Sequence, residues 1–287
     1  MQEKKKEFIA IKTDSLLNVL IENLKDLSKS KIKSLIKYQN VLVENKVVTN
    51  SSKVISANTK VCVYFEKKII ECNNIKILYE DSELIAIDKP SGLLSISTSK
   101  ENHLTAYRLI SEHLKKNNYN NKVYVVHRLD QDTSGVLLFA KNKKMQKILQ
   151  DNWSDLVKVR EYTCVVYGDT KDEERLFSYL TEDNFQKVYS TSNKKGKLAI
   201  TNYKKIKGNN NLSLLNVLIE TGRKNQIRVQ LSDIGHTIVG DKKYGAKTNP
   251  INRLALHASK IIFVDPRNKK TIEIESQIPN NILNLVK

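Results

Sequence analysis

Apolar residues spaced three and four positions apart predict two short helices near the start of the chain. The first covers residues 14–24, with Asp14 or Ser15 as its cap, and the second covers residues 29–37 after a cap at Ser28. In the second helix the apolar positions face inward and the lysines make a basic outer surface. Strand-like runs follow at residues 41–43, 46–48 and 61–65, before a charged linker over residues 67–74.

From residue 75 onward the pattern changes to short apolar runs rich in β-branched residues, which favour strands. We predict strands at residues 77–79, 84–87, 124–126, 136–140, 159–166, 212–219, 254–263 and 271–274. Helical spacing recurs at residues 104–114 and 143–153, and in a short helix that ends at Gly235 and buries Ile227, Leu231 and Ile234. Residues 170–197 are polar, and we predict a surface elaboration there.

This order of elements divides the chain into two predicted domains. Strands outnumber helices in residues 75–287 and do not alternate with them, which favours an α+β domain on a mixed, mainly antiparallel sheet. After a charged leader, residues 13–66 are predicted to form a separate, small α/β domain. A chain of 287 residues can bury both cores without disulfides or metals.

The charge of the chain favours an anionic partner. Lys and Arg number 49 against 31 Asp and Glu, which gives a net charge of +18 and an isoelectric point near 9.6. Nucleic acid is the partner that such a balance most often indicates. A membrane surface, an acidic protein or a general lysine-rich bias of composition are the alternatives.

The three cysteines and the hydropathy of the chain indicate where the protein is located. Cys62, Cys72 and Cys164 show no CxxC spacing and no even pairing, so neither a zinc ribbon nor a disulfide framework is indicated. The basic first residues lack the apolar stretch of a signal peptide, and no apolar run has the length of a membrane span. We therefore expect a cytoplasmic protein.

One polar loop between two apolar runs holds the densest group of ionisable side chains. It has the sequence HRLDQDTSG and covers residues 127–135. Loops fixed by rigid strands are where catalytic and binding residues concentrate. The alternative is a structural turn, because Asp, Thr, Ser and Gly are also the residues that turns require.

Further motifs accompany this loop along residues 75–275. They are Lys89-Pro90-Ser91-Gly92, Arg160-Glu161-Tyr162 with Gly168, Glu220 to Arg228 followed by Gly235-His236 and Gly240-Asp241, and Arg253 to Ala258. With the HRLDQDTSG loop as signature, this region resembles the RluA family of RNA pseudouridine synthases. Residues 13–66, with a basic second helix before a small β unit, resemble the S4 RNA-binding domain.

The resemblance implies a reaction that uses neither a metal nor a redox cofactor, and it implies three catalytic residues. Asp130 matches the family's catalytic aspartate, and a neighbouring cation is expected to hold its pKa down so that it can act as nucleophile or base. Arg228 matches the arginine that pairs with this aspartate through a bidentate fork, with a phosphate contact as the alternative. Tyr162 matches the tyrosine that packs on the target base, with an ordinary core aromatic as the alternative.

Other positions are expected to support the loop or to contact RNA. The resemblance assigns loop support to His127, Thr133, Ser134 and Gly135, and an RNA contact to Arg128. Lys89 either binds loop backbone, approaches phosphate or is a surface lysine, and Arg223 either orders its region, touches RNA or is solvated. Asp132 is a weaker second acid. The helix lysines expected to bind RNA, unless they form only a solvated face, are Lys29, Lys31, Lys33 and Lys37.

The sequence departs from the family pattern at Asn225 and Gln230, which stand where the family usually has histidines. Both can form hydrogen bonds, but neither titrates. The resulting hypothesis is a monomeric RNA pseudouridine synthase that acts on structured RNA, most plausibly large-subunit ribosomal RNA, with transfer RNA left open. An inactive RNA-binding or ribosome-assembly factor is one alternative. An S4-containing methyltransferase is another, but the chain has no Gly-rich cofactor loop after a strand.

Overall fold

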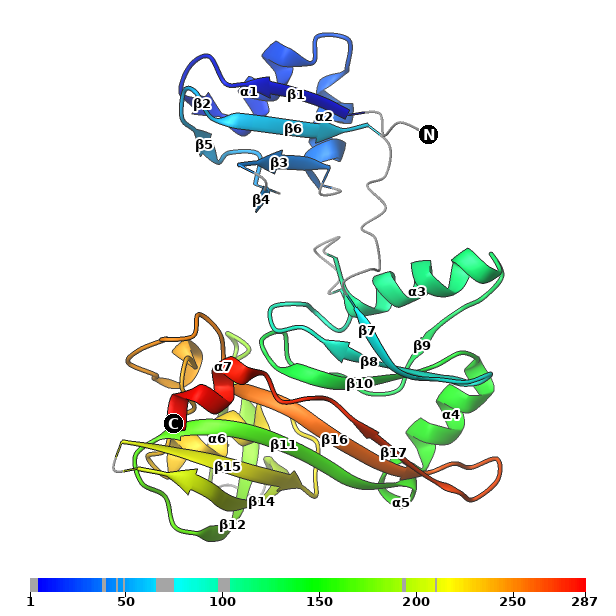
Figure 1. Ribbon diagram of the computed structural model, residues 1–287, viewed down its shortest axis with the longest axis vertical. Helices are drawn as coiled ribbons and strands as arrows, with labels where there is room; N and C mark the ends of the chain where they lie inside the picture. Colours follow the sequence, from blue (N-terminus) through cyan, green and yellow to red (C-terminus); the bar gives the residue numbers. More distant parts are fainter. Residues whose placement is uncertain are drawn as a thin grey trace. The chain divides into compact units, whose positions relative to one another are not determined.

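The computed structural model divides the chain into two units, each with its own hydrophobic core (Figure 1). It describes residues 5–37, 40–44, 46–48, 50–65, 75–97, 104–192, 195–209 and 211–287. The smaller unit comprises Met1–Cys72 with Ser97–Leu104, and the larger comprises Asn73–Ile96 with Thr105–Lys287. Among the residues described, none of the helices is both long and apolar enough to span a membrane.

The small unit packs two helices on a four-stranded sheet. The helices α1 (Leu16–Asn23) and α2 (Lys29–Lys37) lie where the apolar spacing predicts them, and Ser15 and Ser28 accept hydrogen bonds from the amides of Asn18 and Lys31. The sheet has the order β1 (Lys5–Ile9), β6 (Lys60–Tyr64), β3 (Val41–Val43) and β4 (Lys46–Val47), and a separate pair joins β2 (Asp14–Ser15) to β5 (Val54–Ile55). The core contains Ile32, Leu35 and Ile36 of α2, as expected.

Strand β1 lies where a charged leader was expected. It pairs antiparallel with β6, from Lys5 opposite Tyr64 to Ile9 opposite Lys60. Phe8 is the only residue of β1 that packs against the core. The sequence of β1 therefore shows no alternation of apolar residues, and the strand could not be predicted from it. The predicted linker over residues 67–74 lies outside the described residues.

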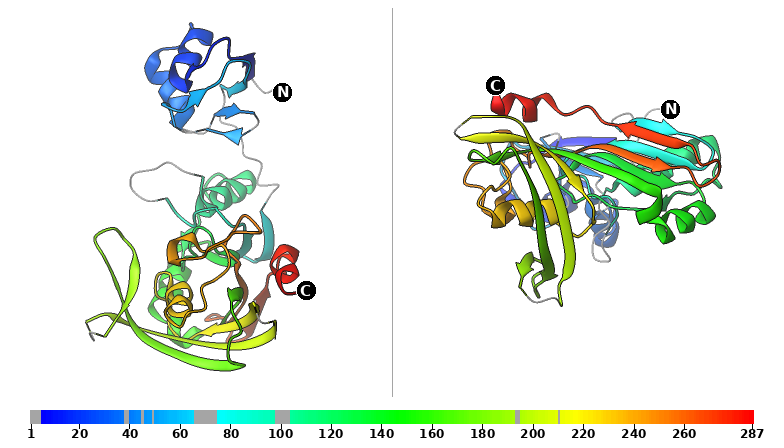
Figure 2. Two further views of the ribbon diagram at one scale, coloured as in Figure 1. Left: turned by 90° about the vertical axis from the view of Figure 1, so that its left-hand side faces the viewer. Right: turned by 90° about the horizontal axis from the view of Figure 1, so that it is seen from below.

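Eleven strands of the large unit form one sheet (Figures 1 and 2). Its order is β13-β12-β14-β15-β11-β16-β10-β8-β7, with β17 beside β16 and β9 beside β10. The strands are β7 (Lys76–Glu80), β8 (Leu84–Lys89), β9 (Tyr124–Val125), β10 (Ser134–Ala140), β11 (Val157–Tyr167), β12 (Glu173–Glu182), β13 (Val188–Thr191), β14 (Lys197–Gly208), β15 (Leu212–Ile219), β16 (Leu256–Val264) and β17 (Thr271–Glu275). Between these described strands only the β10–β16 pairing is parallel, which confirms the predicted mixed, mainly antiparallel sheet.

Helices cover both faces of the sheet around β10. On one face, α3 (Ala106–Asn117) packs against Ile85, Ile87, Leu137 and Phe139. On the opposite face, α4 (Lys143–Asp151) and α5 (Trp153–Leu156) pack against the alternate strand positions. Strand β10 is therefore buried along its whole length, and the loop before it starts from a fixed point.

Two predictions for the large unit were wrong. Residues 170–197 are not a surface elaboration, because β12, β13 and the start of β14 extend the main sheet and bury Leu176, Leu180 and Val188. Many positions of these strands are exposed or only half-buried, which hid the strand pattern. Ile234 does not belong to a buried helix face, since α6 (Gln226–Asp233) ends before it and Ile234 is 37% exposed.

Three further short helices belong to the described part of the large unit. They are η2 (Lys242–Tyr244), α7 (Asn280–Leu283) and η3 (Asn284–Val286). α6 buries all six of its residues from Gln226 to Leu231, including three polar ones, so it is not an amphipathic surface helix. Polar side chains buried on this helix need partners, and the partners of Arg228 belong to the candidate site.

Candidate active site

The ammonium group of Lys89 supports the polar loop between β9 and β10 through hydrogen bonds. Lys89 is fully buried at the end of β8, and its Nζ donates to the carbonyl oxygens of Pro90, Leu93 and Gln131 at 3.0, 2.7 and 2.9 Å. Burial lowers the pKa of Lys89 to about 7, against the opposing effect of nearby Asp132 and Asp130. The sequence left three possibilities open for Lys89. The buried position and the three hydrogen bonds show that it binds the loop backbone and that it is neither a phosphate contact nor a surface lysine.

The segment after Lys89 fastens the loop at three further points. Ser95 Oγ donates to the carbonyl of Leu129 at 2.8 Å and accepts from the Leu129 amide at 3.1 Å. Ser91 Oγ donates to the carbonyl of Asp132 at 2.7 Å, and the amide of Gly92 donates to the carbonyl of Gln131 at 2.9 Å. These bonds bracket Asp130, so the position of its backbone is fixed from both sides.

The turn that leads into β10 is set by Thr133, Ser134 and Gly135. The Thr133 amide donates to the Asp130 carbonyl at 3.2 Å, and Ser134 Oγ lies 2.5 Å from an Arg253 Nη2 donor and 2.8 Å from His257 Nδ1. Gly135 has φ of +112°, and a Cβ on it would lie 2.1 Å from the carbonyl oxygen of Ala258 in β16. Only glycine fits there, because β10 and β16 approach each other at this residue.

His127 supports the far end of the loop as a neutral side chain. Its Nε2 accepts a hydrogen bond from the amide of Leu138 at 3.0 Å, and its ring centroid lies 5.0 Å from that of Trp153. Burial, with a smaller effect of the Arg160 cation, lowers the pKa of His127 to about 4. The accepting nitrogen requires the unprotonated form, so the low pKa and the hydrogen bond agree.

Arg228 is buried on α6, and its guanidinium fork is directed at Asp241. Its Nε and Nη2 donate to Oδ2 and Oδ1 of Asp241, both at 2.7 Å. Its Nη1 donates to Oδ1 of Asn225 at 3.1 Å, and its Cζ lies 5.1 Å from the ring centroid of Tyr244. The expected ion pair with Asp130 is present as a contact of 3.6 Å between Nη1 and Oδ2 of Asp130, but the expected bidentate geometry was wrong, because the fork is given to Asp241.

The pKa of Asp130 is also different from expectation. Burial raises the pKa of Asp130 above its ordinary value, and the opposing influence of Arg228, with smaller effects of Lys243 and Lys89, does not offset it. The expectation of a lowered pKa was wrong because burial outweighs the charge of Arg228, whose fork is already satisfied by Asp241 and which makes one contact of 3.6 Å with Asp130 among the described residues. Asp130 keeps its carboxylate oxygens available at the surface of a cavity.

Tyr162 lies on β11 next to an irregularity in the pairing of β11 with β16. The register shifts between Glu161 and Tyr162, a feature that re-aims side chains near functional sites. The Tyr162 ring is partly buried and packs against two core clusters. Burial raises the pKa of Tyr162 to about 12, with Arg160 opposing and Asp130 adding to the shift, so the hydroxyl stays protonated.

A cavity of about 670 Å³ opens over Asp130 and Arg228. Several of its basic and amide side chains were not identified as site residues from the sequence, namely Lys242, Lys243, Asn249, Asn252 and Arg253. Asp241, which also lines it, appeared in the sequence only as part of a Gly-Asp motif. The pairing of Asp241 with Arg228 could not be predicted from their spacing in the sequence, because the turn that follows α6 brings the two residues together.

The two residues that stand where histidines were expected form structural hydrogen bonds. Asn225 has φ of +54° at the start of α6 and joins Arg228 to the Tyr244 hydroxyl, to which its Nδ2 donates at 3.0 Å. Gln230 is buried and donates to Ser178 Oγ and the Ala199 carbonyl. Both positions therefore use hydrogen bonding without a titrating group.

The predicted RNA contacts lie outside the buried part of the site. Arg128 is exposed, and exposed Arg223 donates through Nε to the Leu198 carbonyl at 2.8 Å, which supports an ordering effect on its region. Exposed Asp132 lines the cavity. On α2 of the small unit, Lys29, Lys31 and Lys33 are exposed, and the side chain of Lys37 lies outside what the structure describes.

Comparison with known proteins assigns the class. A family model described as RNA pseudouridylate synthase matches residues 83–233, which include the loop, Tyr162 and Arg228. The chain belongs to this family and is an RNA pseudouridine synthase.

Relatives agree over most of the chain. The chain is 32% identical over 278 residues to the uncharacterized RNA pseudouridine synthase YhcT of Bacillus subtilis, covering 94% of this chain and 91% of the relative. It is 37% identical over 210 residues to the ribosomal large subunit pseudouridine synthase C of Rickettsia felis, covering 71% and 67%. The solved structure of human RNA Pseudouridylate Synthase Domain Containing 4 shares the fold, with a TM-score of 0.61 and 20% identity over 72% of this chain and 90% of that one.

Proposed function

We propose that this enzyme isomerises specific uridines of large-subunit ribosomal RNA to pseudouridine, with Asp130 as the reacting carboxylate. The observation that supports this most is the placement of Asp130. Hydrogen bonds hold its backbone on both sides, while its carboxylate faces a basic cavity and, among the described residues, has one ion pair of 3.6 Å, to Arg228. A carboxylate held in place but not enclosed by hydrogen bonds can attack or accept a proton. The relatives named for the ribosomal large subunit support the substrate.

Arg228 and Tyr162 complete the proposed catalytic set. Arg228 supplies a fixed positive charge 3.6 Å from Asp130, which favours the ionised carboxylate despite its burial. Tyr162 presents a protonated aromatic side chain near Asp130, suited to packing on a base turned out of its helix. Arg128, exposed two residues before Asp130, is positioned to contact the displaced RNA.

The central experiment maps pseudouridines in RNA. Total RNA from cells with and without the gene is compared, and the gene is restored as wild type or as Asp130→Ala. We expect one or a few pseudouridines of large-subunit ribosomal RNA to vanish on deletion and to return with wild type only. If no site vanishes, the proposed function fails. If Asp130→Ala restores the site, the assignment of Asp130 fails. A lost site in transfer RNA would refute the ribosomal substrate alone.

For the small unit we propose RNA binding as an S4-like domain, on the strength of the exposed lysines of α2. Replacing Lys29, Lys31 and Lys33 by Gln in the full chain removes up to three phosphate contacts. We expect the slope of log affinity against log salt to fall by about 2 to 3. The matched control replaces the exposed Lys158, Lys269 and Lys270 of the large unit. Equal slopes for the two triple variants would contradict an RNA-binding function for α2. The monomeric state and the cytoplasmic location stay predictions.

A further inference from the structure

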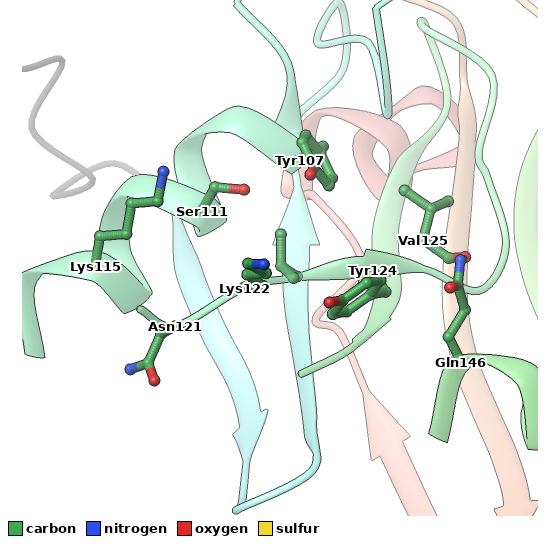
Figure 3. A pocket seen from close by; sticks show the side chains of 9 residues that line it. Tyr107, Ser111, Lys115, Asn121, Lys122, Tyr124, Val125 and Gln146 are labelled. Carbon is green, nitrogen blue, oxygen red and sulfur yellow. The ribbon is translucent and has the colours of Figure 1, made fainter. Parts of the chain in front are cut away.

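A second cavity lies between α3, β9 and α4, within the large unit (Figure 3). Its volume is about 320 Å³, at the lower end of the range of about 300–1,000 Å³ that ligand pockets occupy. Two tyrosines, two lysines, a serine and two amide side chains line it with two valines, and none of these nine residues is acidic. The proposed catalytic reaction uses none of them.

The tyrosines bring aromatic surface to this cavity from two elements. Tyr107 stands on the first turn of α3 and is 40% exposed, and Tyr124 stands on β9 and is partly buried. Figure 3 shows both rings at the cavity. Exposed aromatic faces are costly to leave in water, and they are the surfaces on which unpaired nucleobases stack.

The lysines bring positive charge to the same cavity. Lys115 and Lys122 are both exposed, and the described residues provide no carboxylate partner for either. Lys115 Nζ lies 5.7 Å from the ring centroid of Tyr119, which is itself 83% exposed. Ammonium groups beside aromatic rings match a phosphate next to a base, because the cation meets the backbone while the ring meets the base.

The amides offer hydrogen-bonding edges. Asn121 Nδ2 donates to the Leu114 carbonyl at 3.0 Å, and Gln146 Nε2 donates to the Val125 carbonyl at 2.9 Å. Both amides are thereby oriented, while Oδ1 of Asn121 and Oε1 of Gln146 have no partner among the described residues. A nucleobase offers the N–H donors that such oxygens accept.

The cavity is connected to the loop that carries Asp130. The Tyr107 amide donates to the carbonyl of Ser95 at 3.1 Å, and Ser95 Oγ is bonded to Leu129. Val125, which lines the cavity, precedes Asp130 by five residues, a span of at most about 17 Å. At about 3.4 Å per stacked nucleotide, an RNA strand could reach from one place to the other within about five nucleotides.

We propose that this cavity binds one unpaired nucleotide of the RNA whose uridine reacts at Asp130. The base stacks on Tyr107 or Tyr124, and the adjoining phosphate lies at Lys115 and Lys122. The inference rests on the proposed function for the identity of the RNA, but the binding itself is measurable without any reaction.

The test uses the full-length protein and a fluorescein-labelled, mixed-sequence, single-stranded RNA of eight nucleotides. The variant Tyr107→Ala with Tyr124→Ala should bind this RNA about tenfold or more weakly, since stacking is lost. The variant with both tyrosines changed to Phe keeps the stacking surface and should bind like wild type. Tyr189→Ala, at an exposed tyrosine of β13, is the matched control and should bind like wild type. Circular dichroism confirms that each variant is folded.

The lysines give a second readout that does not depend on the aromatic rings. Lys115→Gln with Lys122→Gln should lower the salt slope by about 1.4, and the control pair Lys158→Gln with Lys270→Gln should not. Unchanged affinity and salt slope in the cavity variants would overturn the proposal, as would an acidic protein that binds the cavity while the RNA does not.

Failure of the two proposals is distinguishable. Asp130→Asn should retain the full oligonucleotide affinity and lose isomerisation. If wild type modifies no uridine but its affinity still depends on Tyr107 and Tyr124, the cavity assignment stands and the proposed reaction falls. If uridines are modified with equal kcat/KM by the double alanine variant, the cavity assignment falls and the reaction stands.

Discussion

The Arg228 guanidinium donates to both carboxylate oxygens of Asp241 at 2.7 Å, while its Nη1 lies 3.6 Å from Oδ2 of Asp130. Asp241 is 1% exposed and Arg228 is 7% exposed, so this is a buried pair in which each charge depends on the other. Asp241 thereby holds the arginine at a fixed distance from Asp130. If Arg228 gave its fork to Asp130 instead, it would enclose the carboxylate that we propose as the reacting group.

Asp241→Asn tests this positioning. The amide keeps one acceptor but loses the charge, so Arg228 is free to move towards Asp130. We expect kcat to fall about 100-fold, the effect of a misplacement of about 1 Å. Burial raises the pKa of Asp130, and a closer cation opposes that shift, so the acidic limb of the pH–kcat profile should move to lower pH.

A matched control exists in the same unit. Asp265 is 1% exposed and accepts from Arg267 Nε at 2.8 Å and Nη2 at 2.6 Å. It follows the last residue of β16, whereas Ser134 pairs with the other end of that strand at His257. Asp265→Asn should lower stability, yet leave kcat within about twofold. An acidic limb that stays in place in Asp241→Asn, or an equal loss of kcat in both variants, would remove the positioning function of Asp241.

Lys89→Met should detach the loop from its support. The methionine fills the buried space but leaves the carbonyls of Pro90, Leu93 and Gln131 without this donor, at about 1–3 kcal/mol each. We expect a loss of unfolding free energy of several kcal/mol and a large loss of kcat in the protein that remains folded. Urea unfolding and single-turnover isomerisation measure the two effects.

The comparison variant for Lys89 is Lys141→Met. Lys141 lies just after the other end of β10, with Nζ bonded to Glu80 and to the Asp81 carbonyl. Its replacement should cost stability and leave the single-turnover rate of the folded protein nearly unchanged. A normal rate in Lys89→Met would show that the loop does not need this support.

His127 predicts a pH dependence of stability. Its pKa is about 4 in the folded protein and 6.5 as the ordinary value. Between these values the unfolded chain binds a proton that the folded protein does not, so the contribution of neutral His127 is complete above pH 6.5 and is lost as the pH falls towards 4. The loss amounts to at most about 3 kcal/mol.

His127→Gln should remove this dependence, because the glutamine oxygen can still accept from the Leu138 amide without titrating. Urea unfolding at pH 7 and pH 4 measures it, with fluorescence from Trp153, the one tryptophan of the sequence, as the signal beside His127. We expect the stability of wild type relative to His127→Gln to decline between these pH values. A constant difference would mean that His127 is not held neutral.

Gly135→Ala should disrupt the start of β10. The new Cβ would meet the Ala258 carbonyl at 2.1 Å, a backbone atom that can move only if β10 and β16 separate. We expect a loss above about 3 kcal/mol, or failure to fold. Gly245→Ala is the control, since Gly245 also has a positive φ but has nothing within 4 Å of its Cβ position, and strain alone should cost about 1 kcal/mol. Similar losses in both variants would contradict the close approach.

The sequence by itself determined the local elements. The apolar spacing predicted α1, α2, the strands β9 and β10 on either side of the loop, and β15. This was possible because a buried face requires apolar residues at regular intervals along the sequence. It also determined which chemistry is present, since the HRLDQDTSG loop and Arg228 could be identified by motif. The polar strands β12 and β13 were not predicted because only a few of their residues are buried.

Only the tertiary structure decided which polar groups meet. The pairing of β8 with β10 places buried Lys89 under the loop, and the turn after α6 brings Asp241 to Arg228 ahead of Asp130. The pKa of Asp130 is raised because Asp130 is buried and because the fork of Arg228 is paired with Asp241. A sequence pattern reports which side of an element is apolar, but the partner of a buried charge depends on the approach of distant segments, which the pattern does not contain.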